Sequence, residues 1–178
     1  MMMRISFIVV AYNAAGSLGA LLEDLLAQTI PHEQIEALLV DSASTDATRA
    51  IMLDFAKAAP FEVKVLDNPK RWLASGINVA LGAATGDAII RLDAHARIPR
   101  DFLQKNLQAL TRGEDIVGGC VLGGAPSGAW ESVLRTVDTS RFCGGAAPFR
   151  NGGEALYVDT LAYALYRREV YDKVGLYD

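Results

Sequence analysis

Apolar residues occur along this chain in two alternating patterns, one typical of buried strands and the other of helices. The run from Ile5 to Tyr12 is almost continuously apolar and rich in β-branched residues, as expected for a central strand buried on both faces of a parallel sheet. After Ser17, leucines recur at helical spacing, which predicts a helix with Ser17 as N-cap and with Glu23 and Asp24 on its exposed face. The chain is therefore expected to begin with a strand followed by a helix.

The same alternation continues through the first half of the chain. Further strands are predicted over Ile35 to Asp41, Phe61 to Leu66 and Asp87 to Leu92, and helices over Asp46 to Ala58 and Ser75 to Ala84. Repeated βα units are typical of an α/β fold with a mostly parallel sheet flanked by helices. We therefore predict one Rossmann-like domain that spans residues 1–178.

The second half of the chain is less regular. Pro99 opens another predicted helix, and a strand is expected near Ile116 to Leu122. Nine glycines between Gly118 and Gly153 indicate a region rich in loops. The last predicted elements are a short amphipathic helix, a long strand and a closing helix, over Trp130 to Val137, Tyr157 to Tyr166 and Arg168 to Val174.

Composition and charge narrow the classes of protein that this chain can belong to. Hydrophobic residues make up 51% of the chain and charged residues 21%, which excludes disordered and coiled-coil classes. A net charge of −4 gives no dense basic surface, so we expect no nucleic-acid partner. Cys120 and Cys143 are too far apart for a zinc or redox motif, and we expect them to be buried, reduced thiols, which suits the cytoplasm.

No part of the sequence is long and apolar enough to predict a membrane span. A transmembrane helix needs about 20 consecutive apolar residues, and no stretch of this chain approaches that length. We therefore expect a cytoplasmic protein. Association with the inner face of the cell membrane, in a full-length protein, would come only from regions outside this chain.

Polar residues end the predicted strands, at the edge where open α/β sheets bind their ligands. These ends read Ala11-Tyr12-Asn13, Asp41-Ser42, Asp67-Asn68 and Asp93-Ala94-His95. Some have a structural alternative, since Asn13 and Asp46 can cap helices and Asp67-Asn68 can form a turn. Asp41 and Asp93 are harder to explain in that way. A carboxylate at the end of an apolar strand loses part of its hydration, so it needs a partner that offsets this cost.

Three further features are candidates for chemistry. Asp93 and His95 are two residues apart and can share one divalent cation, manganese or magnesium, although His95 can also be a plain turn residue. Lys70-Arg71 offers cations to phosphate oxygens, with a solvated basic turn as the alternative. The helix that starts Ser75-Gly76-Ile77-Asn78 is made of small residues, which predicts close packing on the sheet or backbone amides free for an anion.

Four short motifs follow one another in a recognisable order. They are Ile8-Val9-Val10-Ala11-Tyr12-Asn13, Val40-Asp41-Ser42-Ala43-Ser44-Thr45-Asp46, Gly76-Ile77-Asn78 with Thr85-Gly86-Asp87, and Asp93-Ala94-His95. In this order and spacing they resemble the family 2 glycosyltransferases of GT-A fold. The later segments Tyr157-Val158-Asp159-Thr160 and Val174-Gly175-Leu176-Tyr177-Asp178 are similar, more narrowly, to succinoglycan-type exopolysaccharide glycosyltransferases.

The resemblance implies a nucleotide-sugar site and a metal site. Ala11 and Tyr12 would line the base pocket, Arg71 would lie near the phosphates, and Asp93 would face the ribose and the metal. In full, the implied nucleotide-sugar site is Ala11, Tyr12, Asn13, Asp41, Ser42, Arg71, Asn78 and Asp93, and the implied metal ligands are Asp93 and His95.

The activity that the resemblance implies is metal-dependent, inverting sugar transfer from a nucleotide-diphospho-sugar, with a UDP-sugar expected. The acceptor would be a saccharide or a lipid-linked saccharide, in exopolysaccharide or cell-surface glycan synthesis. Two residues depart from the wider family: Ser42 replaces an acid that contacts uracil, and His95 replaces a second metal-binding aspartate.

The catalytic base of this family is expected beyond Asp178, so we expect this chain to end before it; Asp159 is the candidate within the chain. A non-catalytic nucleotide-binding or scaffold module is the alternative function, in which the strand-end acids are structural. A nucleotidylyltransferase, a dinucleotide-binding enzyme and a P-loop enzyme are disfavoured, because no glycine-rich loop follows the first strand.

Overall fold

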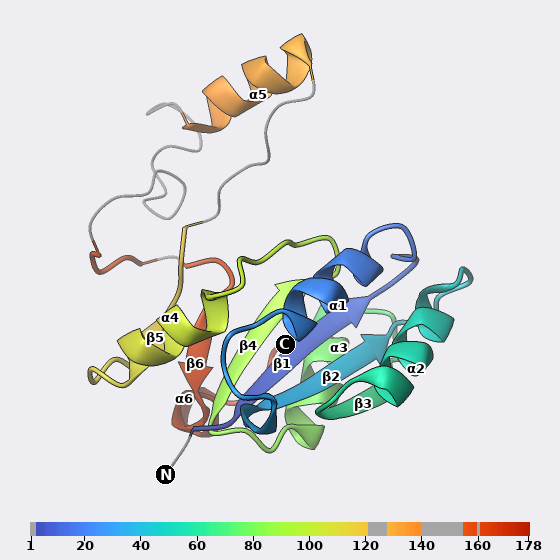
Figure 1. Ribbon diagram of the computed structural model, residues 1–178, viewed down its shortest axis with the longest axis horizontal. Coiled ribbons are helices and arrows are strands. Elements are labelled where there is room, and N and C mark those ends of the chain that lie inside the picture. The colour runs from blue at the N-terminus through green and yellow to red at the C-terminus, as the bar shows by residue number, and fades with distance from the viewer. Residues whose placement is uncertain (1–2, 121–127, 140–154, 160) are drawn as a thin grey trace. The chain divides into compact units, whose positions relative to one another are not determined.

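The computed structural model describes residues 3–120, 128–139, 155–159 and 161–178 (Figure 1). The chain divides into two compact units: Met1–Val117 with Leu165–Asp178, and Gly118–Ala164. The first unit holds one six-stranded sheet in the order β3-β2-β1-β4-β6-β5. Its strands are β1 (Ile5–Ala11), β2 (Ile35–Asp41), β3 (Glu62–Asp67), β4 (Ala88–Asp93), β5 (Ile116–Val117) and β6 (Leu165–Arg167).

The sheet is parallel from β3 to β4, and β6 pairs antiparallel with both β4 and β5. The predicted α/β architecture with a mostly parallel sheet is therefore confirmed, and β1 is central as expected. Helices join the strands and flank them. In the first unit they are α1 (Leu18–Leu26), α2 (Thr48–Ala58), α3 (Leu73–Ala83), α4 (Phe102–Leu110) and α6 (Arg168–Val174), with a 3₁₀ turn over His32–Gln34.

The helices cover both faces of the sheet. Figure 1 shows α1 and α2 in front of the strands and α3 behind them. This division follows from the chain order: the steps from β1 to β2 and from β2 to β3 run one way along the sheet, whereas the step from β3 to β4 runs the other way. Since βα crossovers are right-handed, the reversal places α3 on the opposite face.

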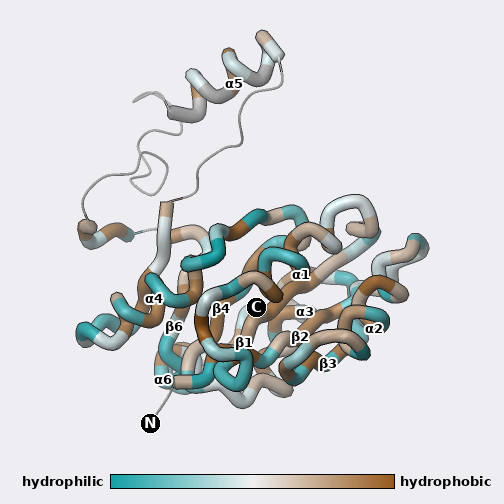
Figure 2. The backbone as a smooth tube through the Cα atoms, viewed as in Figure 1, coloured by the Kyte–Doolittle hydropathy of each residue, from teal (hydrophilic) through white to brown (hydrophobic). Residues whose placement is uncertain are grey.

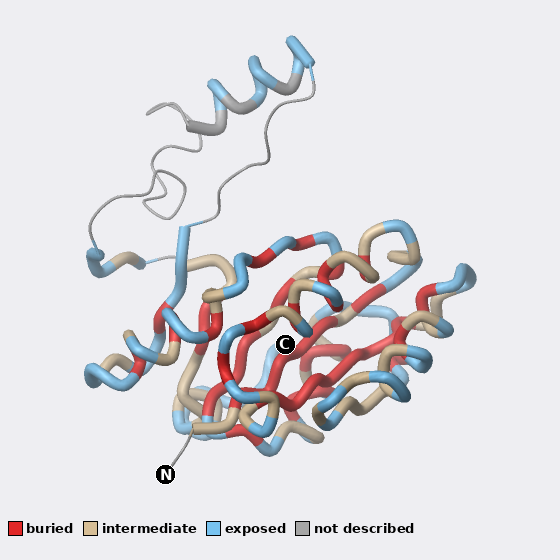
Figure 3. The backbone as a smooth tube through the Cα atoms, in the orientation of Figure 1, coloured by how far each residue is buried: buried red, intermediate tan, exposed pale blue. Residues whose placement is uncertain are grey.

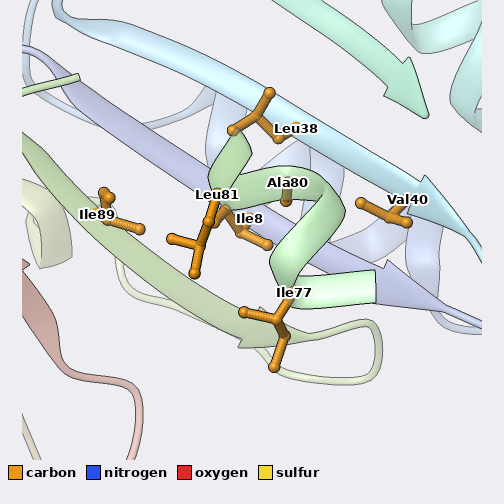
Figure 4. Packing of buried hydrophobic residues seen from close by; sticks show 7 residues of the cluster. All are labelled: Ile8, Leu38, Val40, Ile77, Ala80, Leu81 and Ile89. Atoms are coloured by element: carbon orange, nitrogen blue, oxygen red, sulfur yellow. The ribbon is translucent and has the colours of Figure 1, made fainter. Parts of the chain in front are cut away.

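The core lies between the sheet and its helices. Figure 2 shows the hydrophobic residues concentrated along the central strands, and Figure 3 shows these strands buried. On the α3 face, β1, β2, β4 and α3 contribute one cluster (Figure 4), and Tyr171 of α6 packs against it. Its members are Ile8, Leu38, Val40, Ile77, Ala80, Leu81 and Ile89.

The start of α3 packs directly on β1, as its small residues predict. A Cβ atom on Gly76 would lie 2.6 Å from Cγ1 of Val10 and 3.0 Å from Nδ2 of Asn68. A side chain at this position would displace the Val10 or Asn68 side chain, or the helix itself. The predicted close packing is confirmed, and it fixes the beginning of α3 beside the carboxyl end of β1.

The Thr85-Gly86-Asp87 motif lies at the opposite, amino-terminal edge of the strands, around the buried carboxylate of Glu36. That carboxylate accepts hydrogen bonds from Oγ of Ser6 (2.6 Å), Nζ of Lys64 (2.8 Å), and the backbone N–H and hydroxyl of Thr85 (2.9 and 3.0 Å). Burial alone would raise the pKa of Glu36, but these donors outweigh it and lower the pKa to about 2. The motif is therefore structural and joins α3 to β4.

Two of the sequence-based predictions in the second half of the chain are wrong. Among the described residues of the long strand expected over Tyr157 to Tyr166, only Leu165 and Tyr166 lie in a strand, β6 (Leu165–Arg167), which pairs there with the two-residue β5 and with three residues of β4; Thr160 lies outside the described residues. The strand expected near Ile116 to Leu122 ends at Val117, where Gly118 and Gly119 follow; Leu122 lies outside the described residues.

Smaller corrections concern helix ends and a cysteine. Ser17 is the N-cap residue of α1, but its hydroxyl makes no capping hydrogen bond. Cys120 is exposed rather than buried, because it follows the end of the short edge strand β5; Cys143 lies outside the described residues. The predicted amphipathic helix is present in the second unit as α5 (Ala129–Thr139). Within the described part of the chain, no helix has the length and apolar character needed to cross a bilayer.

Candidate functional site

The carboxyl ends of the parallel strands lie side by side at one edge of the sheet. Asp41, the last residue of β2, is in register with Ala11 of β1 and with Asp67 of β3, and Asp93 of β4 is in register with Val10. The chain reverses its direction along the sheet between β1 and β4. A reversal of this kind opens a crevice beyond the strand ends, where ligands bind in open α/β sheets.

The loops that follow β1, β2 and β3 each contain a non-glycine residue in the left-handed region. These residues are Asn13 (φ 48°), Ala43 (φ 57°) and Arg71 (φ 64°). Such a conformation costs about 1–3 kcal/mol for a residue with a side chain, and it persists where surrounding contacts hold it. Strained residues are often found at functional sites. Their presence in three neighbouring loops therefore indicates that this edge of the sheet is a candidate functional site.

Asn13 is held by the loop after β2. Its backbone N–H donates to Oγ of Ser44 (3.0 Å), and its side-chain oxygen accepts from the backbone N–H of Thr45 (2.8 Å). Two residues on, the N–H of Ala15 donates to the carboxylate of Asp46 (3.1 Å). Hydrogen bonds from Thr48 lower the pKa of that carboxyl group, so Asp46 stays ionised. Asn13 and Asp46 therefore join the two loops.

Asp41 is buried at the strand end beside an arginine that the sequence analysis did not identify. Its side chain is 5% exposed; Oδ1 accepts from the backbone N–H of Ser44 (3.2 Å), and Oδ2 lies 3.8 Å from Nη1 of Arg49. The same guanidinium also pairs with Asp67. Arg49 comes from α2 and offsets the charge of two neighbouring strand ends, a pairing that only the register of β2 and β3 brings about.

Ser42 is buried and joined to the start of α3 through Asn68. The side-chain N–H groups of Asn68 donate to Oγ of Ser42 and to the carbonyl of Trp72, both at 2.9 Å, while its side-chain oxygen accepts from the hydroxyl of Ser75 (2.5 Å). Ser42 thus occupies the predicted position beside Asp41. Asn68 is more than a turn residue, because it connects the β2 loop with α3.

Tyr12 and Arg71 form the exposed part of this edge. The ring of Tyr12 is half exposed, and the Cζ atom of Arg71 lies 5.7 Å from its centroid, within the range of a cation–π contact. The contact joins the residue after β1 to the segment that leads into α3. An aromatic ring and a guanidinium group therefore lie together at this edge, and these are the types of group that can bind a nucleoside and its phosphates.

Asp93 and His95 lie in a tight turn at the end of β4. The carbonyl of Asp93 accepts a hydrogen bond from the N–H of Ala96 (2.9 Å) and closes the turn. Ala94 and Ala96 are buried and His95 is exposed, so the backbone is anchored while the imidazole faces solvent. Nη2 of Arg91 lies 3.6 Å from Oδ1 of Asp93. In the described part of the chain, no cluster of three or more histidine, cysteine or acidic side chains forms a closed metal site.

Asn78 has a partner that the sequence did not predict. Both ends of its carboxamide are hydrogen-bonded to the backbone of Tyr177: Nδ2 donates to the carbonyl (2.7 Å), and Oδ1 accepts from the N–H (2.9 Å). The hydroxyl groups of Tyr177 and Tyr171 lie 3.4 Å apart. Asn78 therefore holds the segment after α6 against α3, and its predicted contact with the nucleotide sugar stays a prediction.

Two predicted residues remain, Asp159 and Ala11. Asp159 belongs to the second unit, where its side chain is exposed. Ala11 is buried in register with Asp41 of β2, whereas the Tyr12 side chain that follows it is half exposed. The structure thus brings most of the predicted nucleotide-sugar residues together and leaves the catalytic base unassigned.

Comparison with known proteins identifies one family. The model of the family described as "Glycosyl transferase family 2" matches residues 6–175. Among curated proteins, the chain is 30% identical over 171 residues to the succinoglycan biosynthesis protein ExoA of Rhizobium meliloti, a match that covers 93% of this chain and 50% of that protein. It is 28% identical over 170 residues to a dolichyl-linked diacetamido-dideoxy-glucuronosyltransferase of Methanococcus voltae, covering 91% and 52%. The chain therefore spans about half the length of these relatives.

Solved structures show the same fold. The mannosyltransferase PcManGT of Pyrobaculum calidifontis, in complex with GDP-Man and Mn²⁺, superimposes with a TM-score of 0.74 at 27% identity, covering 100% of this chain and 48% of that one. The TarS protein of S. aureus, residues 1–349 in complex with UDP-GlcNAc, gives a TM-score of 0.72 at 22% identity, covering 98% and 48%. The predicted GT-A, Rossmann-like fold is confirmed.

Proposed function

We propose that this chain, which belongs to glycosyl transferase family 2, binds a nucleotide-diphospho-sugar and takes part in the transfer of its sugar. The donor is a UDP-sugar and the reaction inverts the anomeric centre. The acceptor is a saccharide or lipid-linked saccharide, in exopolysaccharide or cell-surface glycan synthesis in the cytoplasm. The succinoglycan and dolichyl-linked glycan relatives support this class of product.

One observation carries the proposal: Tyr12 and Arg71 are in contact at the carboxyl edge where Asp41 and Asp93 also end their strands. Tyr12 supplies an aromatic face for the base, and Asp41 supplies carboxylate oxygens for its N–H groups. Arg71 supplies donors for phosphate oxygens. The four side chains come from three neighbouring strand ends and from the loop after β3, so they lie at one edge of the sheet.

The donor set of the Asp93–His95 turn fits a divalent cation. One carboxylate and one imidazole leave most coordination positions open for phosphate oxygens and water, which is the usual arrangement for magnesium or manganese on a nucleotide. The imidazole of His95 favours manganese, and the relative solved with GDP-Man holds Mn²⁺. When bound, the cation would neutralise charge on the departing nucleoside diphosphate. Asp93 and His95 are the residues that would hold it.

The protein groups then have separate tasks in the reaction. Arg71 binds the diphosphate and stabilises the negative charge that grows on it as the sugar leaves. Tyr12 and Asp41 hold the nucleoside, so that the anomeric carbon has a fixed position. A carboxylate removes the proton of the acceptor hydroxyl as that oxygen attacks the carbon from the opposite side, which inverts its configuration. Asp159 is the candidate for a contribution on the acceptor side.

Calorimetric titration of UDP and of GDP, each with Mn²⁺ and with excess chelator, tests the proposal. We expect UDP to bind more tightly than GDP, and binding to weaken by at least tenfold when the metal is removed. Tighter binding of GDP would show that the donor is a GDP-sugar and not a UDP-sugar, with the base still bound beside Ser42 and Asp41. It would not contradict a nucleotide-sugar site at this edge of the sheet. Equal affinity with and without metal would contradict the metal-dependent site.

A non-catalytic nucleotide-binding or scaffold module is the second candidate. The pairing of Asp41 and Asp67 with Arg49, and of Asn13 with the β2 loop, shows that several polar groups at this edge also have structural partners. This candidate predicts no metal-dependent UDP binding, so the same titration separates it from a glycosyltransferase.

A further inference from the structure

Helix α1 is tied to the segment that follows His95 through a carboxylate that the sequence placed on the exposed face of the helix. Oδ2 of Asp24 accepts from Nε of Arg97 (2.6 Å) and from the backbone N–H of Ile98 (3.1 Å), while Oδ1 accepts from Nη2 of Arg97 (2.8 Å). The side chain of Asp24 is only 14% exposed. A two-point ion pair with an added backbone hydrogen bond fixes geometry as well as charge.

Gln28, one turn further along, makes a second connection between the same two segments. Its side-chain N–H groups donate to the carbonyl of Pro99 (2.9 Å), and its side-chain oxygen accepts from the N–H of Leu103 (3.0 Å). The N–H of Thr29 also donates to the carbonyl of Arg100 (2.9 Å). The chain from Arg97 to Leu103 is therefore hydrogen-bonded at several successive points to α1 and to the residues that directly follow it.

These connections leave a short span between two fixed points. On one side β4 ends at Asp93, and on the other Asp24 holds Arg97 and Ile98. Ala94, Ala96 and Ile98 are buried, whereas His95 and Arg97 are exposed. The backbone at His95 is thus held on one side by β4 and on the other side by the hydrogen bonds that Arg97 and Ile98 make with Asp24. These two supports set the direction of the His95 side chain.

We propose that Asp24 is a positioning residue: by holding Arg97 and Ile98, it keeps the Asp93–Ala96 turn in the shape that lets His95 share a divalent cation with Asp93. The inference rests on the proposed function, because it assigns a role in the same metal-assisted nucleotide binding. Asp24 itself contacts neither the nucleotide nor the metal. Its effect reaches the site through the backbone from Arg97 to His95.

The core packing of α1 makes it a firm support for this turn. Leu18, Leu21 and Leu25 of the helix are fully buried, and each buried leucine contributes about 1.5–3 kcal/mol. The N–H of Leu18 donates to the carbonyl of Ala14, so the helix starts directly after the Tyr12-Asn13 loop. One rigid helix therefore connects the loop expected to hold the base with the turn expected to hold the metal.

Asp24→Asn tests the inference, because asparagine keeps the size of the side chain but loses the carboxylate that pairs with both nitrogens of Arg97. We would titrate UDP or GDP, whichever the wild-type protein binds more tightly, with Mn²⁺ and with excess chelator. The expected result is a loss of about tenfold in the Mn²⁺-dependent gain in affinity, with metal-free affinity changed less than twofold. Asp24→Glu, which restores the carboxylate, should recover most of the gain.

Two further measurements separate positioning from loss of folding. Asp101→Asn is the matched control, since it breaks the Asp101–Lys105 pair (2.7 Å) at the start of α4 and should leave the Mn²⁺-dependent gain unchanged. Hydrogen exchange of the metal-free protein should show faster exchange at the Ala96 and Ile98 amides in Asp24→Asn, with the exchange of β1 unaltered.

Three outcomes would overturn the inference. An unchanged Mn²⁺-dependent gain in Asp24→Asn would show that the turn does not depend on Asp24. An equal loss with and without metal would show a general structural role instead. Absence of any metal effect in the wild-type protein would overturn the proposed metal-dependent function together with this inference, whereas a normal wild-type effect with an unaffected variant would overturn the inference alone.

Discussion

The guanidinium group of Arg71 lies over the ring of Tyr12, with 5.7 Å between its Cζ atom and the ring centroid. The backbone of Arg71 is in the left-handed region, and that of Asn13, next to Tyr12, is as well. The side chains of Tyr12 and Arg71 therefore belong to loops whose backbone is strained and held by hydrogen bonds. This relationship places an aromatic ring and a guanidinium group together in the protein without a bound ligand.

Removal of the Tyr12 ring should weaken nucleotide binding. Tyr12→Ala is expected to cost about 1–3 kcal/mol in UDP affinity, because one stacked base on an aromatic side chain is worth about that much. Tyr12→Phe is the control and should bind nearly as well as the wild-type protein. Calorimetry measures both, and unchanged affinity in Tyr12→Ala would place the base elsewhere.

Replacement of Arg71 should affect the diphosphate and not the nucleoside. Arg71→Gln is expected to lower UDP affinity by about tenfold or more, since a charge-assisted hydrogen bond to a phosphate contributes about 1.5–3 kcal/mol. Uridine, which lacks phosphates, should bind both proteins equally. A parallel loss of uridine affinity would instead show that Arg71 acts by holding the Tyr12 ring.

The sequence predicted most of the fold because its elements follow from local patterns. β2 and α6 have the predicted bounds, and β1 is the central strand expected from its β-branched run. The second half was harder to predict, because the length of β6 depends on the strands that lie beside it and not on its own residues. Glycines at 118 and 119 were visible in the sequence, but their effect on β5 depends on the position of the sheet edge.

The candidate site was predictable only in part. Strand-end residues such as Tyr12, Asp41 and Asp93 are found from sequence, since parallel strands bring their carboxyl ends to one edge. Arg49 was missed because it lies on α2, outside any strand end, and Asp24 because its charge indicated a solvent-facing position. Long-range pairs of this kind need the packing of the helices on the sheet, which no local pattern specifies.

The buried Glu36 should make folding stability depend on pH in the acid range. Its pKa falls from 4.5 to about 2 on folding, so ionised Glu36 contributes stability that is fully present above about pH 4.5. That contribution, on the order of 3 kcal/mol, is lost as pH falls from 4.5 through 2. Chemical denaturation should therefore give a higher free energy of unfolding for the wild-type protein than for Glu36→Gln at pH 7, and this difference should narrow below pH 4.5. A difference that does not change with pH would contradict this account.

Gly86 should tolerate no side chain. A Cβ atom there would lie 2.6 Å from the backbone nitrogen of Ser6 and 2.9 Å from the carbonyl oxygen of Arg4, neither of which can move without a shift of β1. Gly86→Ala is therefore expected to destabilise the protein by about 1–3 kcal/mol or more. Gly82→Ala in α3 is the control, because nothing lies within 4 Å of its added Cβ; it should be neutral or stabilising by up to about 1 kcal/mol. Thermal unfolding compares the two variants, and equal melting temperatures would contradict the close packing at Gly86.

The most direct test of a metal-dependent nucleotide site at this edge is UDP titration of the Asp93→Ala variant, with Mn²⁺ and with excess chelator, beside the wild-type protein. We predict that the variant loses the Mn²⁺-dependent gain in affinity while its melting temperature stays close to that of the wild-type protein, because Asp93 lies at a partly exposed strand end. A variant that keeps the full gain, or that loses affinity only because it unfolds, would contradict the account.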